Sequence, residues 1–172
     1  MNYATIKYND VSNGPGIRTS LFVSGCTHRC KGCFNSVAWD FDYGEKYTEK
    51  TENELIESLK SPFIKGITLL GGEPFEPQNQ EELLKLTLRI KKELPDKTVW
   101  CFSGYTIEEM LTGDLSKCPT TLPLLKSIDV LVDGKFVEEL KSLMLKFKGS
   151  SNQRTILVKE TLEKGEIVLL YE

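Results

Sequence analysis

The sequence lacks any hydrophobic run long enough to cross a membrane. Its longest apolar run, Ile167–Tyr171, is far shorter than the roughly 20 residues of a membrane-spanning helix. The first ten residues are polar, so we expect no signal peptide. Positive charge is not in excess either, because 22 Lys and Arg stand against 25 Asp and Glu, and no basic run offers a track for phosphates. These absences predict a soluble cytoplasmic protein that binds neither membranes nor nucleic acid.

Cysteine is also scarce, with five in 172 residues. An odd number in a chain without a predicted secretion signal does not indicate a disulfide framework and suits a reducing cytosol. The chain has no low-complexity stretch, no long linker and no convincing internal repeat. Its length is that of one domain with a proper core, so we predict a single domain over residues 1–172.

Three of the five cysteines are gathered in one short segment. Cys26, Cys30 and Cys33 have the spacing C-x3-C-x2-C, and a loop this short brings all three sulfurs near one metal centre. Complete iron–sulfur sites take four cysteines, and closed zinc sites take four Cys or His ligands. Three ligands leave one iron of a 4Fe–4S cluster open, and an open iron is where chemistry can occur. The spacing therefore predicts a 4Fe–4S cluster held by these three cysteines.

A zinc site is the main alternative for the same residues. His28 lies between Cys26 and Cys30 and would nominally complete a Cys3His set. Such closely spaced ligands would crowd one ion, whereas zinc sites typically use two separated ligand pairs. We therefore favour the cluster over zinc or inert thiols, and we expect His28 to be a loop side chain near the cluster.

Apolar strands alternate with helices along the rest of the chain. The predicted strands are Thr19–Ser24, Gly66–Leu70, Thr98–Phe102, Ile128–Val132, Thr155–Val158 and Ile167–Leu170. The predicted helices are one opened by a capping box at Thr51–Glu54, followed by Gln80–Leu94, Thr106–Leu111 and Phe136–Met144. We expect a loop at Pro119–Pro123.

This alternation predicts an α/β fold with a mostly parallel sheet. A closed eight-fold barrel needs about 250 residues, so a partial, open (β/α) barrel fits the chain better. Chemistry in such folds lies at the carboxyl ends of the strands. Four candidate segments each follow a strand: the cysteine loop, Gly71–Pro74, Ser103–Gly104 and Asp133–Gly134. We expect them to share one face.

Several motifs extend this interpretation to a family. The cysteine spacing with Phe34 directly after it resembles the signature of radical S-adenosylmethionine enzymes. Further motifs occur in order at residues 14–22, Asn35, Trp39–Phe41, Thr68–Pro74, Ser103–Thr106, Asp129–Gly134 and Gly149–Arg154. Together they span roughly residues 1–160 and resemble the anaerobic ribonucleoside-triphosphate reductase activating proteins, which are glycyl-radical-enzyme activases.

The resemblance implies an oxidoreductase activity and a set of cofactor contacts. An electron from the cluster would cleave S-adenosylmethionine, and the 5′-deoxyadenosyl radical would take hydrogen from a glycine of the anaerobic ribonucleoside-triphosphate reductase. Gly32 and Phe34 would border the adenine, although core packing is the alternative for Phe34. The backbone and carboxylate of the Gly71-Gly72-Glu73-Pro74 segment would accept the methionyl ammonium. Ser103 and Asp133 are candidates for the ribose or carboxylate, or are loop or capping residues.

Other residues and partners are less constrained by the sequence. Cys101 is expected to be a buried structural thiol and Cys118 a loop residue, so electrons would come from an external donor such as flavodoxin or ferredoxin. Gly149–Arg154 is either a helix stop with a solvated basic face or, as the resemblance implies, a contact with the reductase or the active-site rim. Alternative functions are activation of another glycyl-radical enzyme, such as pyruvate formate-lyase, or a non-catalytic iron–sulfur or zinc module.

Overall fold

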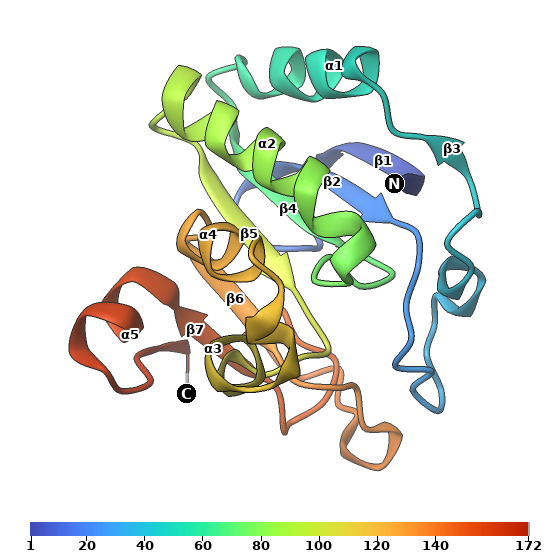
Figure 1. Ribbon diagram of the computed structural model, residues 1–172, viewed down its shortest axis with the longest axis vertical. Helices are drawn as coiled ribbons and strands as arrows, with labels where there is room; N and C mark the ends of the chain where they lie inside the picture. The colour runs from blue at the N-terminus through green and yellow to red at the C-terminus, as the bar shows by residue number, and fades with distance from the viewer. Residues whose placement is uncertain (172) are drawn as a thin grey trace.

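The computed structural model describes residues 1–171, which form an α/β fold around one mixed, open sheet of eight strands (Figure 1). The strands follow the spatial order β3-β1-β2-β4-β5-β6-β7-β8. Their bounds are β1 Asn2–Asp10, β2 Ile17–Val23, β3 Glu45–Lys46, β4 Ile64–Gly71, β5 Thr98–Phe102, β6 Val130–Asp133, β7 Arg154–Leu157 and β8 Leu169–Tyr171. The helices are α1 Glu49–Leu59, α2 Pro77–Glu93, α3 Ile107–Thr112, α4 Thr121–Lys126 and α5 Val158–Lys164.

The prediction of a mostly parallel sheet is wrong. Strands β2, β4, β5 and β6 pair in parallel, but β1 pairs antiparallel with β2 and β3, and β7 pairs antiparallel with β6 and β8. Parallel neighbours need a crossover of a dozen or more residues. The short turn between β1 and β2 therefore forces a hairpin, which the polar sequence of β1 did not indicate.

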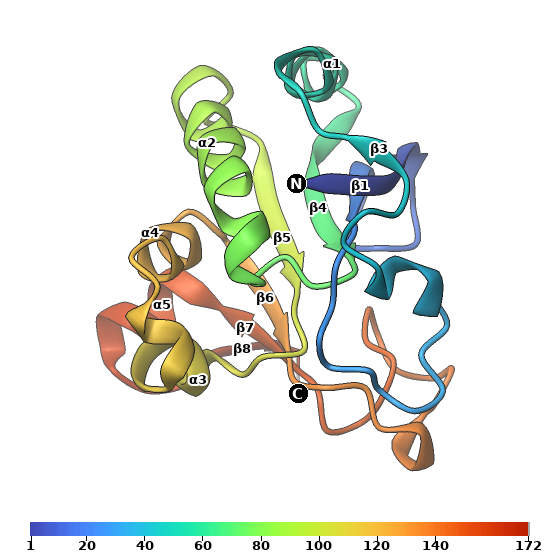
Figure 2. The ribbon, with the colours of Figure 1, turned by 45° about the vertical axis from the view of Figure 1, so that its right-hand side comes forward.

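The central strands lie where the apolar pattern predicts them. The predicted strands Thr19–Ser24, Gly66–Leu70, Thr98–Phe102 and Ile128–Val132 overlap β2, β4, β5 and β6. Successive side chains of these strands point to opposite faces of the sheet and therefore belong to two different hydrophobic cores. In β5, Val99 and Cys101 pack toward the helices, whereas Trp100 belongs to a smaller cluster with Val130 and Val132. Figures 1 and 2 show the helices covering one face of the sheet.

Cys101 is completely buried in the larger core, which confirms the prediction of a structural thiol there. None of the helices within residues 1–171 combines the length and the apolar character that a membrane crossing requires.

Three other expectations for local structure were wrong. Helix α1 begins one turn earlier than predicted, because Thr48 and Thr51 form the capping box. Helix α4 begins inside the predicted Pro119–Pro123 loop, since Pro123 falls in its first turn, where a missing N–H is tolerated. The predicted helix Phe136–Met144 is only a 3-10 turn at Glu138–Leu140.

The chain after that 3-10 turn doubles back instead of continuing as a helix. Lys141 bridges to Ser150 in antiparallel fashion, and the intervening Phe147 has a left-handed φ of 52°. Backbone pairing within this segment therefore takes the place of the predicted helix.

Candidate functional site

A cavity of about 440 Å³ lies at the carboxyl ends of the parallel strands. Nine of the eleven residues predicted to bind the cluster or S-adenosylmethionine line it, namely Cys26, Cys30, Gly32, Cys33, Phe34, Gly71, Gly72, Glu73 and Ser103. They come from the loop after β2 and from the ends of β4 and β5. The segment after β6 closes another side, and Figure 2 shows it beside the loop after β2. The expected convergence of strand-end segments is therefore present, with Gly134 as the contribution from β6.

The three cysteines of the motif are free thiols, partly exposed to this cavity. Burial raises the pKa of Cys26 to about 11, and nearby Glu73 and Glu76 act in the same direction. Burial also raises the pKa of Cys30. Thiolates are the metal-binding form, so positive charge from bound iron would stabilise these sulfurs as ligands.

The cysteines are not arranged around a single metal ion. Within residues 1–171, no three Cys, His, Asp or Glu side chains come close enough to hold one ion together. A tetrahedral zinc site needs its ligands to converge on one atom. A cubane cluster instead binds each cysteine at a different iron, so the sulfurs need not converge on one atom. The donor set, three sulfurs facing a cavity, fits a 4Fe–4S cluster better than zinc.

Glu73 connects the cysteine loop to the ends of two strands. Its carboxylate is 1% exposed and accepts hydrogen bonds on both oxygens. Oε1 accepts the N–H of Phe75 and the hydroxyl of Ser103, each at 2.8 Å. Oε2 accepts the N–H of Gly104 at 2.7 Å and lies 2.8 Å from His28 Nε2. His28 is thus engaged by a carboxylate, and contact of Glu73 with a ligand ammonium stays a prediction.

Gly71 and Gly72 allow the end of β4 to approach the backbone of the neighbouring loop. Gly71 has φ of 107°, a conformation that favours glycine. A Cβ atom on Gly72 would lie 2.6 Å from the carbonyl oxygen of Gly25 and 2.9 Å from that of Ala38. Close packing between two chain segments therefore requires glycine at position 72, whether or not a ligand also approaches there.

Two buried polar residues that were not predicted from the sequence hold the base of the cysteine loop in place through hydrogen bonds. Glu76 Oε1 accepts the N–H of Thr27 at 2.7 Å and its hydroxyl at 2.6 Å. Asn79 Nδ2 donates to the carbonyls of Ser24 and Glu73, each at 3.0 Å. Glu73 lies in the turn before α2, Glu76 is its N-cap residue and Asn79 lies in its first turn. The available signal was a group of polar residues between the end of a strand and the start of a helix.

Comparison with known proteins agrees with this geometry. The profile of the 4Fe-4S single cluster domain matches residues 12–156. Proteins of Vibrio cholerae serotype O1 and Escherichia coli K12 are 44% and 43% identical over 155 residues, which cover 89% of this chain and 96% of each relative. A protein of enterobacteria phage T4 is 40% identical over 154 residues, 90% of this chain and 92% of the relative. Each is named anaerobic ribonucleoside-triphosphate reductase-activating protein.

The chain belongs to the anaerobic ribonucleoside-triphosphate reductase-activating protein family. As a member of this family it carries a 4Fe-4S single cluster domain over most of its length. The cavity lined by the three cysteines lies within the matched residues.

Two residues of this activating-protein family member that were predicted to bind the cofactor do not line the cavity. Pro74 lies in the turn before α2, outside the cavity wall. Asp133 is 1% exposed and pairs with Arg154 through two hydrogen bonds of 2.9 and 2.6 Å. Its Oδ2 also accepts the N–H of Ile107 at 2.8 Å. Arg154 reaches onward to Glu108 and holds the pKa of that carboxyl below its ordinary value.

The remaining residues of the family motifs divide between cavity and core. Phe34 is 92% exposed and lines the cavity, so the core-packing alternative for it is wrong. Trp39 also lines the cavity, and Arg29 stacks over its ring at 5.4 Å. Arg18 is instead buried in the sheet, donating to Thr68 Oγ1 at 2.9 Å, and burial lowers its pKa to about 10.

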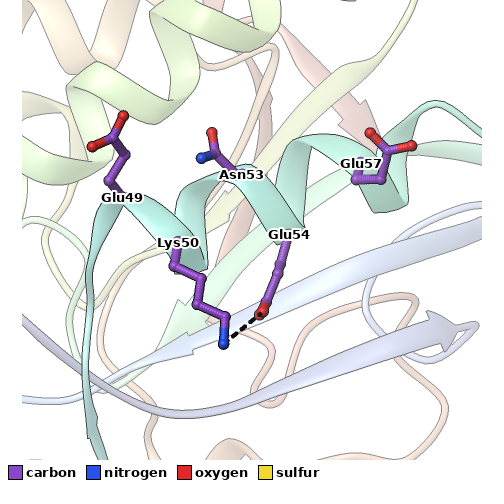
Figure 3. Close-up of a pocket in the computed structure, with 5 residues that line it drawn as sticks. All are labelled: Glu49, Lys50, Asn53, Glu54 and Glu57. Atoms are coloured by element: carbon purple, nitrogen blue, oxygen red, sulfur yellow. Dashed lines mark ion pairs between the residues drawn. The ribbon is translucent and has the colours of Figure 1, made fainter.

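A second hollow lies on the outer face of α1 (Figure 3). It is lined by Glu49, Lys50, Asn53, Glu54 and Glu57, all from one helix. Lys50 and Glu54 are 4.0 Å apart, an exposed pair one helical turn apart. These side chains form a solvated helix face and contribute nothing to the cysteine-lined cavity.

Proposed function

We propose that the protein is an activating enzyme for the anaerobic ribonucleoside-triphosphate reductase. It reductively cleaves S-adenosylmethionine at a 4Fe–4S cluster and generates a glycyl radical on the reductase. The observation that carries this proposal is the set of three cysteines facing one cavity, in a chain whose relatives are named activating proteins. When bound, the cluster and S-adenosylmethionine supply the radical that takes hydrogen from the glycine α-carbon.

In this proposal Cys26, Cys30 and Cys33 hold the cluster, since they provide the sulfur donors that face the cavity. Gly32, Phe34 and Ser103 line the remaining cavity wall and provide the contacts for S-adenosylmethionine, together with the backbone at Gly71–Gly72. Glu73 acts mainly by holding His28 and the end of β5 in place. Pro74 and Asp133 support the surrounding loops.

The shape of the sheet suits a polypeptide substrate. We propose that it is the partial, open (β/α) barrel expected for a radical S-adenosylmethionine enzyme. In support, the described strands run in linear order from β3 to β8 without closing into a ring. An open side can admit a chain segment that carries a glycine. We further propose that flavodoxin or ferredoxin supplies the electron and that the protein acts in the cytoplasm, whose reducing conditions suit free thiols.

Production of 5′-deoxyadenosine tests the proposal against a non-catalytic metal module. The protein is reconstituted anaerobically with iron and sulfide, and then given S-adenosylmethionine and dithionite. We expect 5′-deoxyadenosine, together with a cluster that is lost in Cys26→Ala, Cys30→Ala and Cys33→Ala. Cys101→Ala and Cys118→Ala serve as matched controls that keep the cluster. A full cluster that yields no 5′-deoxyadenosine, or one that depends on Cys101 or Cys118, would contradict the proposal.

A further inference from the structure

The segment between the 3-10 turn at Glu138–Leu140 and β7 forms a hairpin, which we call the rim hairpin (residues 141–150). Its two arms are joined by the bridge between Lys141 and Ser150. The N–H of Ser151 donates to the carbonyl of Leu140 at 3.0 Å just beyond that bridge. In Figure 2 this part of the chain lies beside the cysteine loop.

The Gly149–Arg154 motif braces the rim hairpin. Gln153 Oε1 accepts the N–H groups of Gly149 at 2.8 Å and Ser150 at 3.1 Å, while its Nε2 donates to the carbonyl of Gly134 at 2.9 Å. Ser150 is completely buried, and its Oγ accepts the N–H of Val137 at 3.1 Å. Phe147 anchors the hairpin by packing edge-on against Trp100, with 5.7 Å between ring centroids. The hairpin therefore has a defined position.

The hairpin that is braced in this way exposes two large apolar side chains to solvent. Leu143 and Met144, at the tip of the rim hairpin, are each 93% exposed. On the same hairpin, Leu145 and Phe147 line the cysteine cavity, as does Leu143 itself. Phe34, 92% exposed, lines the cavity from the cysteine loop. Single exposed apolar residues are common, but two large ones that line one cavity, Leu143 and Phe34, with Met144 next to Leu143 in the chain, indicate an interaction surface.

The charge around the tip indicates the character of the partner. Residues 135–148 contain four lysines and two glutamates, whereas the whole chain has a net charge of −3. Both glutamates, Glu138 and Glu139, already face Lys31. Lys141 and Lys148 line the cavity. An apolar segment flanked by carboxylates would complement this surface.

We infer that the tip of the rim hairpin docks the target polypeptide through an apolar segment flanked by carboxylates, beside the glycine that enters the cavity. The inference rests on the proposed function, because that function requires a polypeptide to reach the cysteine cavity. It also assigns a role to the Gly149–Arg154 motif, which is to position the tip of the rim hairpin.

Met144→Asp tests the inference, with Phe63→Asp as the matched control. Phe63 is 74% exposed and precedes the amino end of β4, away from the cavity at the carboxyl ends. Reconstituted protein is titrated with the reductase, and the glycyl radical is measured by electron paramagnetic resonance. The radical yield is divided by the 5′-deoxyadenosine that the same preparation makes without reductase, so loss of cluster or fold does not affect the comparison. Binding is measured in parallel by size-exclusion chromatography.

We expect Met144→Asp to raise the reductase concentration for half-maximal radical formation about tenfold, since a docked apolar side chain is replaced by a charge. Phe63→Asp should match the wild type. Equal titration curves for Met144→Asp and the wild type would overturn the docking inference while the proposed function stands. A Met144→Asp defect in self-association, with unchanged reductase binding, would assign the tip to a second copy and also overturn it. If the wild type makes 5′-deoxyadenosine but no radical on the reductase, the proposed function and the inference both fail.

Discussion

At the residue scale, buried carboxylates organise the ends of the strands. Glu73 binds donors from three segments, and Glu76 holds Thr27. Asp133 similarly joins the end of β6 to the first residue of β7 and to the start of α3. Each carboxylate has hydrogen-bond donors to replace the water it loses on burial. Removing a donor would leave a buried charge with less compensation.

Arg154→Ala tests this arrangement at Asp133. Without Arg154, the carboxylate of Asp133 stays buried and loses its only ion-pair partner among the described residues, so we expect unfolding free energy to fall by about 3 kcal/mol or more. Chemical denaturation of the protein without cluster measures this change.

The matched control is Glu108→Gln, which removes the exposed partner of the same guanidinium. Exposed ion pairs contribute little, so its unfolding free energy should change by less than about 1 kcal/mol. Equal effects of the two substitutions would show that burial of Asp133 does not decide the cost.

Much of the site could be predicted from the sequence because its residues lie close together along the chain. The cysteine spacing and the Gly71–Glu73 segment were recognisable, and the structure places all of these residues at one cavity. The side-chain partners were not recognisable, because they lie far apart in sequence. Glu73 and Ser103 are 30 residues apart, and Asp133 and Arg154 are 21 apart. Only the fold brings such pairs together.

At the element scale, the end of β4 is joined directly to the start of the cysteine loop. The N–H of Gly72 donates to the carbonyl of Val23 at 2.7 Å, and the N–H of Glu73 donates to that of Gly25 at 2.8 Å. This backbone contact sets where the cysteine loop leaves the sheet. The loop and the strand end therefore act as one unit.

Gly72→Ala should disturb that unit. Its Cβ would overlap two backbone carbonyls, which cannot rotate away, so the loop has to shift. We expect the unfolding free energy to fall by about 1–3 kcal/mol and the reconstituted iron content to fall with it. Iron and sulfide analysis after gel filtration, together with denaturation, measures both.

Gly165→Ala provides the comparison for this substitution. Gly165 ends α5 with φ of 72°, and a methyl group added there would meet no atom within 4 Å. The substitution costs about 1 kcal/mol through backbone strain alone and should leave the iron content intact. Full iron content in Gly72→Ala would show that the loop tolerates the clash.

The sequence predicted a strand correctly where its residues form one clear apolar pattern. The apolar strands β2, β4, β5 and β6 are confirmed, because strands buried on both faces give continuous apolar runs. Strand β1 escaped prediction because it is polar and largely exposed at the side of the sheet. The predicted helix Phe136–Met144 included the first four residues of the rim hairpin and was wrong there, because the hairpin is braced by Gln153 and Trp100, which lie outside the predicted helix.

At the scale of the whole molecule, the parallel and antiparallel parts of the mixed sheet have different roles. Its parallel centre points four strand ends at one cavity, while the antiparallel flanks extend the sheet without adding crossovers. The cysteine loop and the rim hairpin are far apart in sequence, but both line that cavity, and Figure 2 shows the two segments beside each other. The proposed function requires the glycine of the reductase to reach this cavity.

The most direct test of that account is the electron paramagnetic resonance spectrum of the reductase after anaerobic incubation with reconstituted protein, S-adenosylmethionine and reductant. We predict a carbon-centred doublet that disappears when the radical-site glycine of the reductase is replaced by alanine, while 5′-deoxyadenosine is still produced without it. Absence of the doublet, or a doublet that forms only on pyruvate formate-lyase, would contradict the account.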